Sequence, residues 1–251
     1  MEIASRIFQT FDALKSADPT VFHSGKGRLD APGPTYSGWY LQRALPDSIK
    51  TYPQIKRLFL RNCTQLRSFT WVESFPNVEQ LWVCGSGKIT DLDGIQAARR
   101  LTSFTLWPSF TATITLSILS AVSSLENLEE YAFAGRTRDG SLEALNLLHN
   151  LKTVFFSNAY SWQEIARFEA HHPELNFSWK GGVTPTRSSS LKCENCGTPQ
   201  SVLTGKGLKL ACPSCDAGYI EKHLKRYAQQ LSNERSKRRF GPEPAMRTER
   251  L

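Results

Sequence analysis

The sequence has no run of about 18 apolar residues, and its beginning does not resemble a secretory signal. Glu2 stands where such a signal carries basic residues, and no long apolar stretch follows it. These absences predict a cytoplasmic protein that makes no contact with a membrane. The apolar residues within 1–15 recur at helical spacing, which predicts a short amphipathic helix packed on the body.

Motifs that mark an enzyme are also missing. The sequence contains no glycine-rich dinucleotide fingerprint and no nucleophile-elbow motif. The five histidines are scattered, and His171 and His172 precede Pro173 at a predicted turn. We therefore expect a protein without catalytic activity and without a small-molecule substrate.

Acidic residues are scarce at the C-terminal end of the chain. Residues 180–251 carry 14 Lys or Arg and 6 Asp or Glu, whereas residues 1–179 carry 17 of each kind. The whole net charge of +8 therefore lies in the last 72 residues. This distribution makes the C-terminal part, and not the neutral body, the candidate for contact with nucleic acid.

A pattern of apolar residues repeats along the middle of the chain. In each copy, apolar residues stand at positions 1, 4 and 6, which a short strand turns to one side. The copies begin, in steps of 23, 23, 27 and 23 residues, at Ile55, Val78, Leu101, Leu128 and Leu151. A weaker copy begins at Leu175. Stacked copies would share one core and one parallel sheet.

This pattern resembles the leucine-rich repeat family over roughly residues 50–180, although the asparagine ladder of typical repeats is largely missing. The resemblance implies an α/β solenoid with a parallel sheet on its concave side and helices on its convex side. Segments 114–125, 142–148 and 162–170 have helical apolar spacing and are expected to form those helices. The alternative is an ordinary α/β domain in which the spacing is a coincidence.

Positions 3, 5 and 7 of the copies are expected to point to the concave side of the sheet. They bring together four large aromatic residues and three charged ones: Phe59, Trp82, Trp107, Phe155, Arg57, Arg61 and Glu130. Exposed aromatic residues beside arginine are typical of protein interfaces. We expect this face to bind a protein partner, and fold analogy suggests a toxin or other effector. The alternative is that the N-terminal segment or the C-terminal tail covers it.

Four of the six cysteines form two C-x-x-C pairs, Cys193–Cys196 and Cys212–Cys215, with fifteen residues between them. Each pair can direct two thiolates at one ion, and two pairs supply a tetrahedron of ligands. Segments 200–203 and 208–211 flank a glycine-rich turn and predict a hairpin. Residues 191–218 thus resemble a zinc ribbon, which implies a structural Zn²⁺ ion; iron binding and redox chemistry are the alternatives.

Beyond the ribbon, apolar residues from Tyr219 to Leu231 have helical spacing, and Gly241 and Pro242 end the predicted helix. Basic residues spread over its other face and beyond are candidates for contact with RNA or DNA: Lys222, Lys225, Arg226, Arg235, Lys237, Arg238 and Arg239. The alternative is a solvated face without a partner. The two remaining cysteines, Cys63 and Cys84, are expected to be free buried thiols.

The sequence thus predicts five parts. They are an N-terminal helix and cap at 1–49, a repeat body at 50–180, a linker at 181–190, a zinc ribbon at 191–218, and a basic helix with a disordered tail at 219–251. The favoured function is a non-enzymatic protein-binding or adaptor module. The second hypothesis is a nucleic-acid-associated protein that uses the ribbon and the basic helix.

Overall fold

The computed structural model describes residues 21–23, 53, 56–61, 66–108, 112–186, 191–207 and 209–240, with the backbone alone at 21–23, 61, 239 and 240. The predicted N-terminal helix, most of the cap, Cys63 and the predicted tail beyond 240 lie outside these residues. The chain divides into two compact units. The first reaches to Tyr160 and includes Leu175–Ser178, and the second contains Ser161–Glu174 and the chain from Trp179 onward.

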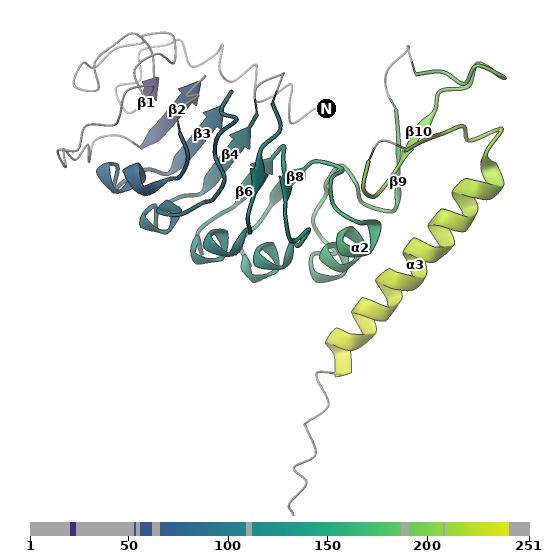
Figure 1. Ribbon diagram of the computed structural model, residues 1–251. Helices are drawn as coiled ribbons and strands as arrows, with labels where there is room; N and C mark the ends of the chain where they lie inside the picture. The colour runs from purple at the N-terminus through teal and green to yellow at the C-terminus, as the bar shows by residue number, and fades with distance from the viewer. Residues whose placement is uncertain are drawn as a thin grey trace, which may run out of the picture. The chain divides into compact units, whose positions relative to one another are not determined.

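The first unit is built on a parallel sheet with the strand order β1-β2-β3-β4-β6-β8 (Figure 1). Its strands are β1 (Val21–His23), β2 (Arg57–Arg61), β3 (Gln80–Cys84), β4 (Ser103–Trp107), β6 (Glu130–Phe133) and β8 (Thr153–Phe156). From β2 to β8, neighbouring strands pair residues that stand 23, 23, 27 and 23 positions apart, as Leu58 pairs with Leu81. The spacing of the sequence repeat is therefore the register of this sheet.

Positions 4 and 6 of the copies form the core of the first unit, as predicted. Leu81, Phe104 and Phe133 are at most 1% exposed. Each such side chain contributes roughly 1.5–3 kcal/mol by leaving water. The weak last copy also joins the sheet, because Asn176 forms a parallel bridge with Thr153.

The segments between the strands contain tight 3₁₀ turns, which lie along one side of the sheet in Figure 1. They are η2 (Thr70–Ser74), η3 (Ile95–Ala97), η4 (Ser120–Ser124) and η5 (Glu143–Leu147). The prediction of helices at 114–125 and 142–148 is thus corrected to the 3₁₀ turns η4 and η5, whereas the segment predicted at 162–170 does form an α-helix, Trp162–His171. In the longest step, β5 (Thr115–Leu116) pairs with β7 (Arg136–Thr137), which follows β6, as a small second sheet.

A ladder of asparagine side chains joins successive copies outside the strands. Asn77, Asn127 and Asn150 each stand directly before position 1 of a copy. Each donates its side-chain N–H to a backbone oxygen 24, 28 and 24 residues earlier, respectively, at 2.8–2.9 Å. The leucine-rich repeat motif places its asparagine after the strand, so sequence reasoning missed this ladder.

The second unit combines an α-helix, a three-stranded antiparallel sheet and a long helix. Its elements are α2 (Trp162–His171), β9 (Val183–Pro185), β10 (Ser201–Leu203), β11 (Lys209–Ala211) and α3 (Ala217–Phe240). The predicted hairpin and the predicted C-terminal helix are confirmed. The predicted linker at 181–190 is wrong for residues 183–185, because β9 pairs with the open edge of β10. None of the helices in the described part of the chain has the length and apolar composition needed to cross a membrane.

Helix α3 packs along α2. The buried hydroxyl of Tyr227 donates to the Glu169 carboxylate at 2.8 Å, and burial together with this carboxylate raises the pKa of Tyr227. Arg238 donates to the backbone oxygens of Ala170 and His171 at 2.8 and 3.0 Å. These two oxygens lie at the C-terminal end of α2, where the helix dipole favours a cation. Arg238, a predicted nucleic-acid contact, is therefore engaged within its own unit.

Two glycines test how closely the turns of successive copies pack. Gly94 has a φ of +93°, and a Cβ there would lie 2.3 Å from the backbone nitrogen of Thr70. Gly140 has a φ of +66°, and a Cβ there would meet no atom within 4 Å. We expect Gly140→Ala to lower the unfolding free energy by about 1–2 kcal/mol, through its left-handed backbone alone. Gly94→Ala adds a clash with backbone and is expected to cost more.

Urea unfolding of both variants, followed by circular dichroism, measures the difference. Equal losses for Gly94→Ala and Gly140→Ala would show that the turns are not packed as closely as the structure indicates.

Candidate functional site

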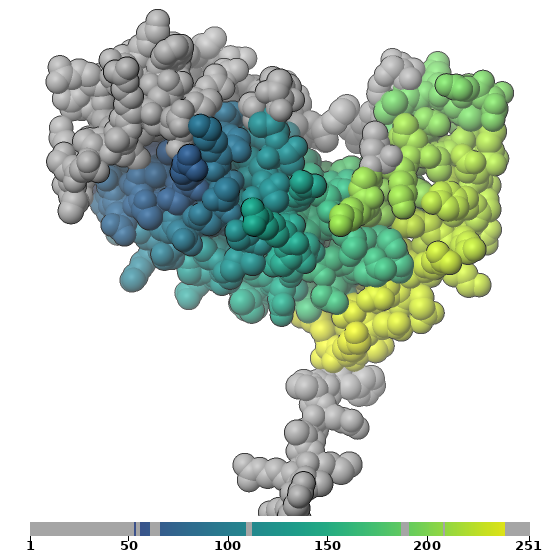
Figure 2. All heavy atoms as spheres, in the orientation of Figure 1, coloured from purple at the N-terminus to yellow at the C-terminus, as the bar shows by residue number. Residues whose placement is uncertain are grey.

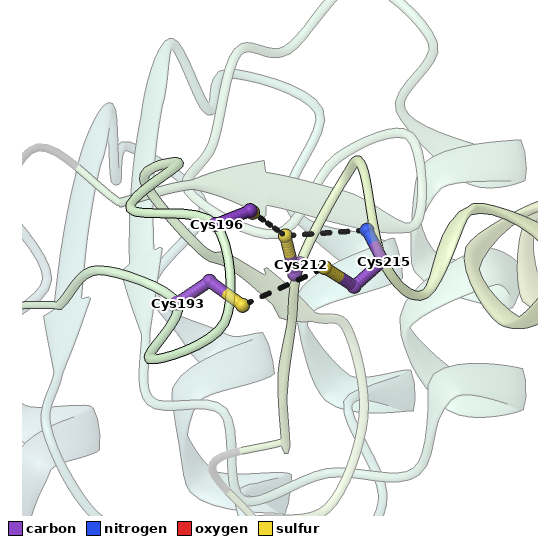
Figure 3. Close-up of side chains that lie close together, drawn as sticks. All are labelled: Cys193, Cys196, Cys212 and Cys215. Atoms are coloured by element: carbon purple, nitrogen blue, oxygen red, sulfur yellow. Dashed lines mark hydrogen bonds between the residues drawn. The ribbon is translucent and has the colours of Figure 1, made fainter.

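The four cysteines of the two C-x-x-C pairs converge in the second unit (Figure 3). Their sulfurs all lie within 4.8 Å of one another. The Sγ atoms of Cys193 and Cys215 are 3.8 Å apart, and those of Cys196 and Cys212 are 3.4 Å apart. A disulfide would need about 2.0 Å, whereas sulfurs placed about 2.3 Å from a tetrahedral ion stand about 3.8 Å apart. The cluster therefore has the geometry to hold one metal ion.

Each cysteine pair is shaped by local hydrogen bonds. The backbone nitrogen of Gly197 donates to the oxygen of Cys193 at 2.9 Å, and Gly197 has a φ of +71°, which favours glycine. In the second pair, the nitrogen of Cys215 donates to the sulfur of Cys212 at 3.4 Å. An N–H group that points at a sulfur stabilises negative charge there, so the second turn favours a thiolate at Cys212.

Two of the four thiols have shifted pKa values. Hydrogen bonds with Thr198 lower the pKa of Cys196 to about 6. Hydrogen bonds with Cys196, Cys193 and Cys212 raise the pKa of Cys215 to about 12. Neighbouring thiolates repel, and a bound cation is what allows all four to stay deprotonated together. The chemistry of the donors thus agrees with the geometry.

The second cysteine pair runs directly into helix α3. The nitrogen of Cys212 donates to the carboxylate of Asp216 at 2.8 Å. The backbone oxygen of Asp216 accepts from the nitrogens of Tyr219 and Ile220, both at 3.0 Å. Asp216 therefore caps the start of α3, and an ion held by the cysteines would determine where that helix begins.

A pocket with a volume of about 360 Å³ lies among α2, the turn between β10 and β11, and the first turns of α3. All of these elements belong to the second unit. Its lining includes four cations and two large aromatic residues: Lys206, Lys209, Lys222, Arg226, Trp162 and Tyr219. Sequence reasoning missed the pocket, because these residues are spread over 65 positions and share no motif.

The basic residues predicted on α3 lie in different surroundings. Lys222 and Arg226 line the pocket. Lys237 forms an ion pair within its own helix at 3.0 Å. Lys225 and Arg235 are exposed on α3, which is yellow in Figure 2, whereas nothing is described of the Arg239 side chain. The structure thus separates two pocket cations from the rest of the set.

The predicted aromatic face of the sheet is present, but its aromatic side chains on β2 and β3 are buried. Phe59 and Trp82 are only 2% and 8% exposed, and their rings meet edge to face with centroids 5.0 Å apart. Neighbouring strands place equal positions of two copies about 4.8 Å apart, so large rings there contact each other. The prediction that these two rings are exposed is wrong.

The second half of this face remains partly open. Trp107 and Phe155 are half-buried, and their rings stack with centroids 5.0 Å apart. The strand between them carries Ala132, whose short side chain lets rings from β4 and β8 meet across β6. Glu130 is exposed and Arg57 half-buried, while the side chain of Arg61 lies outside the described residues.

Comparison with known proteins gives no relative: no protein-family model matches this chain, and no curated protein sequence matches it. Its function is therefore indicated by the chemistry of its own residues.

Removal of one cysteine from the cluster is expected to abolish metal binding. The wild-type chain should carry one ion, measured by plasma mass spectrometry after gel filtration. Cys193→Ser leaves three thiolates and should carry none, because all four ligands are needed to fill a tetrahedral site.

Cys84→Ser is the matched control, since Cys84 is a buried cysteine of the first unit that takes no part in the cluster. It should retain the ion. Metal content that is unchanged in Cys193→Ser would contradict the assignment of the cluster.

Proposed function

We propose that the cysteine cluster binds a structural zinc ion and that residues 191–218 form a zinc ribbon. Zinc suits four thiolates at tetrahedral spacing, and it brings no redox chemistry. Four protein ligands fill its shell and leave no position for a substrate. In this proposal the ion contributes much of the folding free energy of a segment with few buried apolar residues.

We further propose that the first unit is an irregular leucine-rich repeat solenoid and that the chain is a non-enzymatic adaptor that binds a protein partner. The constant register of the strands supports the solenoid. A stack of repeats offers a large surface that is already ordered before binding, so association costs little conformational entropy. Such a surface suits protein recognition better than catalysis.

The stacked pair of Trp107 and Phe155 is the observation that carries the partner-binding proposal. These rings are half-buried, and Glu130, two residues before the strand partner of Phe155 on β6, is exposed. Large aromatic residues with a polar rim are typical of the energetic centre of protein interfaces. The partner would therefore contact the β4–β6–β8 part of the sheet, and not the part around Phe59 and Trp82.

A second candidate function is association with nucleic acid through the second unit. The observation in its favour is the pocket with four cations. This candidate requires no contribution from the sheet of the first unit.

Loss of the stacked pair tests the partner-binding proposal. We expect the double variant Trp107→Ala with Phe155→Ala to weaken partner binding by roughly ten-fold or more, because such rings commonly contribute well over 1 kcal/mol to an interface. Pull-down with the immobilised chain and quantitative mass spectrometry identifies the partner, and titration then gives its affinity. Circular dichroism confirms that the variant is folded.

Leu147→Ala is the matched control. Leu147 is 61% exposed on η5, a 3₁₀ turn outside the sheet, so its removal takes away exposed apolar surface elsewhere in the same unit. This variant should bind as the wild type does. Equal affinity of all three chains, or equal weakening of both variants, would refute the proposed surface.

A further inference from the structure

The pocket of the second unit concentrates positive charge. Of the described residues that line it, four are Lys or Arg and none is Asp or Glu. The ion pairs within the described part of this unit join other cations, such as Arg167 and Lys237, to Glu164 and Glu234. The charges of the pocket are therefore available to an anionic ligand.

The start of helix α2 adds to this field. Ser161, Trp162 and Gln163, the first residues of α2, line the pocket. Backbone N–H groups in a first helical turn have no partner inside the helix, and the helix dipole places positive potential there. The nearby carboxylate of Glu164 is paired with Arg167 at 2.8 Å, which reduces its repulsion of an anion.

The ring of His223 lies within the same positive electrostatic potential. Its Nε2 atom lies 3.0 Å from the backbone oxygen of Gly182, to which it can donate. Burial is the main cause that lowers the pKa of His223, while this hydrogen bond raises it and the charges of Lys209 and Arg226 lower it further. Cations from both the hairpin and α3 thus act on one ring at the wall of the pocket.

Two aromatic side chains stand among these cations. Tyr219 is 54% exposed, and Trp162 is half-buried with its ring edge-on to that of His223 at 6.2 Å. Accessible aromatic rings in a basic groove are the usual platforms for nucleic-acid bases. The lining therefore offers partners for both parts of a nucleotide, the phosphate and the base.

We propose that this pocket binds a nucleotide unit of single-stranded nucleic acid, with the phosphate at Lys222, Arg226 and the start of α2, and the base on Trp162 or Tyr219. The volume of about 360 Å³ suits one nucleotide unit. This inference rests on the second candidate function and assigns nucleic-acid binding to this pocket. It is independent of the protein partner proposed for the sheet.

The cysteine cluster contributes indirectly. The helix that follows the second cysteine pair carries Tyr219, Lys222 and Arg226, and its first turn is capped by Asp216, the residue directly after Cys215. An ion at the cysteines would keep these three side chains at the pocket. Removal of the metal by a chelator is therefore expected to reduce binding of the single strand.

Fluorescence anisotropy with the full zinc-loaded chain and a labelled single strand of about 12 nucleotides tests the proposal. Lys222→Ala with Arg226→Ala should weaken binding roughly ten-fold. It should also make the slope of log affinity against log salt concentration shallower, by the amount expected for the loss of about two phosphate contacts. Trp162→Ala should also weaken binding roughly ten-fold. It should remain folded, because the close neighbours of Gly205 are the backbone and Cβ atoms of Trp162, which alanine keeps.

Lys225→Ala with Arg235→Ala is the matched control, since it removes the same charge from the same helix outside the pocket. It should weaken binding much less than the pocket variant. Equal weakening by both variants would overturn the pocket as the site while leaving the second candidate function in place. Absence of binding by the wild type would overturn both.

Competitors distinguish the sources of the ligand. A matched duplex should bind more weakly than the single strand, and AMP should compete at higher concentration than the strand. Inorganic phosphate should compete less well than AMP, because it has no base to stack. Preference for the duplex, for free AMP over the strand, or for phosphate over AMP would overturn the proposal.

Discussion

The approach of four cysteine sulfurs to one another is the interaction on which the second unit depends. Sulfurs at 3.4–3.8 Å repel when ionised, so the arrangement is stable with all four deprotonated only around a cation. The same cysteines end the hairpin and begin α3. Because most of α3 is exposed, its position is set at a few places, chiefly this cluster, Tyr227 and Arg238. An ion bound at the cysteines would thus take the place of an extensive apolar core.

The first unit is stabilised by a different principle. Each copy adds one strand, one tight turn and a row of buried apolar residues, and neighbouring copies are joined by strand pairing and by the asparagine ladder. In the proposed solenoid no single contact would decide the fold, because the stability of such a stack is a sum over interfaces between neighbours. The two units therefore differ: many similar contacts between strands stabilise the first, whereas the second depends chiefly on the cysteine cluster.

The sequence allowed the register of the sheet and the identity of the four clustered cysteines to be predicted, because both follow from residue spacing alone. Burial of Phe59 and Trp82 was not predictable in this way, since it depends on which side chains stand beside them in neighbouring strands. The pocket was hidden for a similar reason. Its walls meet only because the β10–β11 turn packs at Gly205 against the first residue of α2, a contact that no local pattern encodes.

The step between β4 and β6 is four residues longer than the other steps, yet the strands on both sides keep the common register. The longer step contains β5, which lies outside the main sheet and pairs with β7 from the following step. A change in the length of this step therefore need not alter the register of the main sheet. The architecture can accept insertions and deletions between strands during evolution, or a peptide tag introduced by design, while the rows of side chains across the sheet remain aligned.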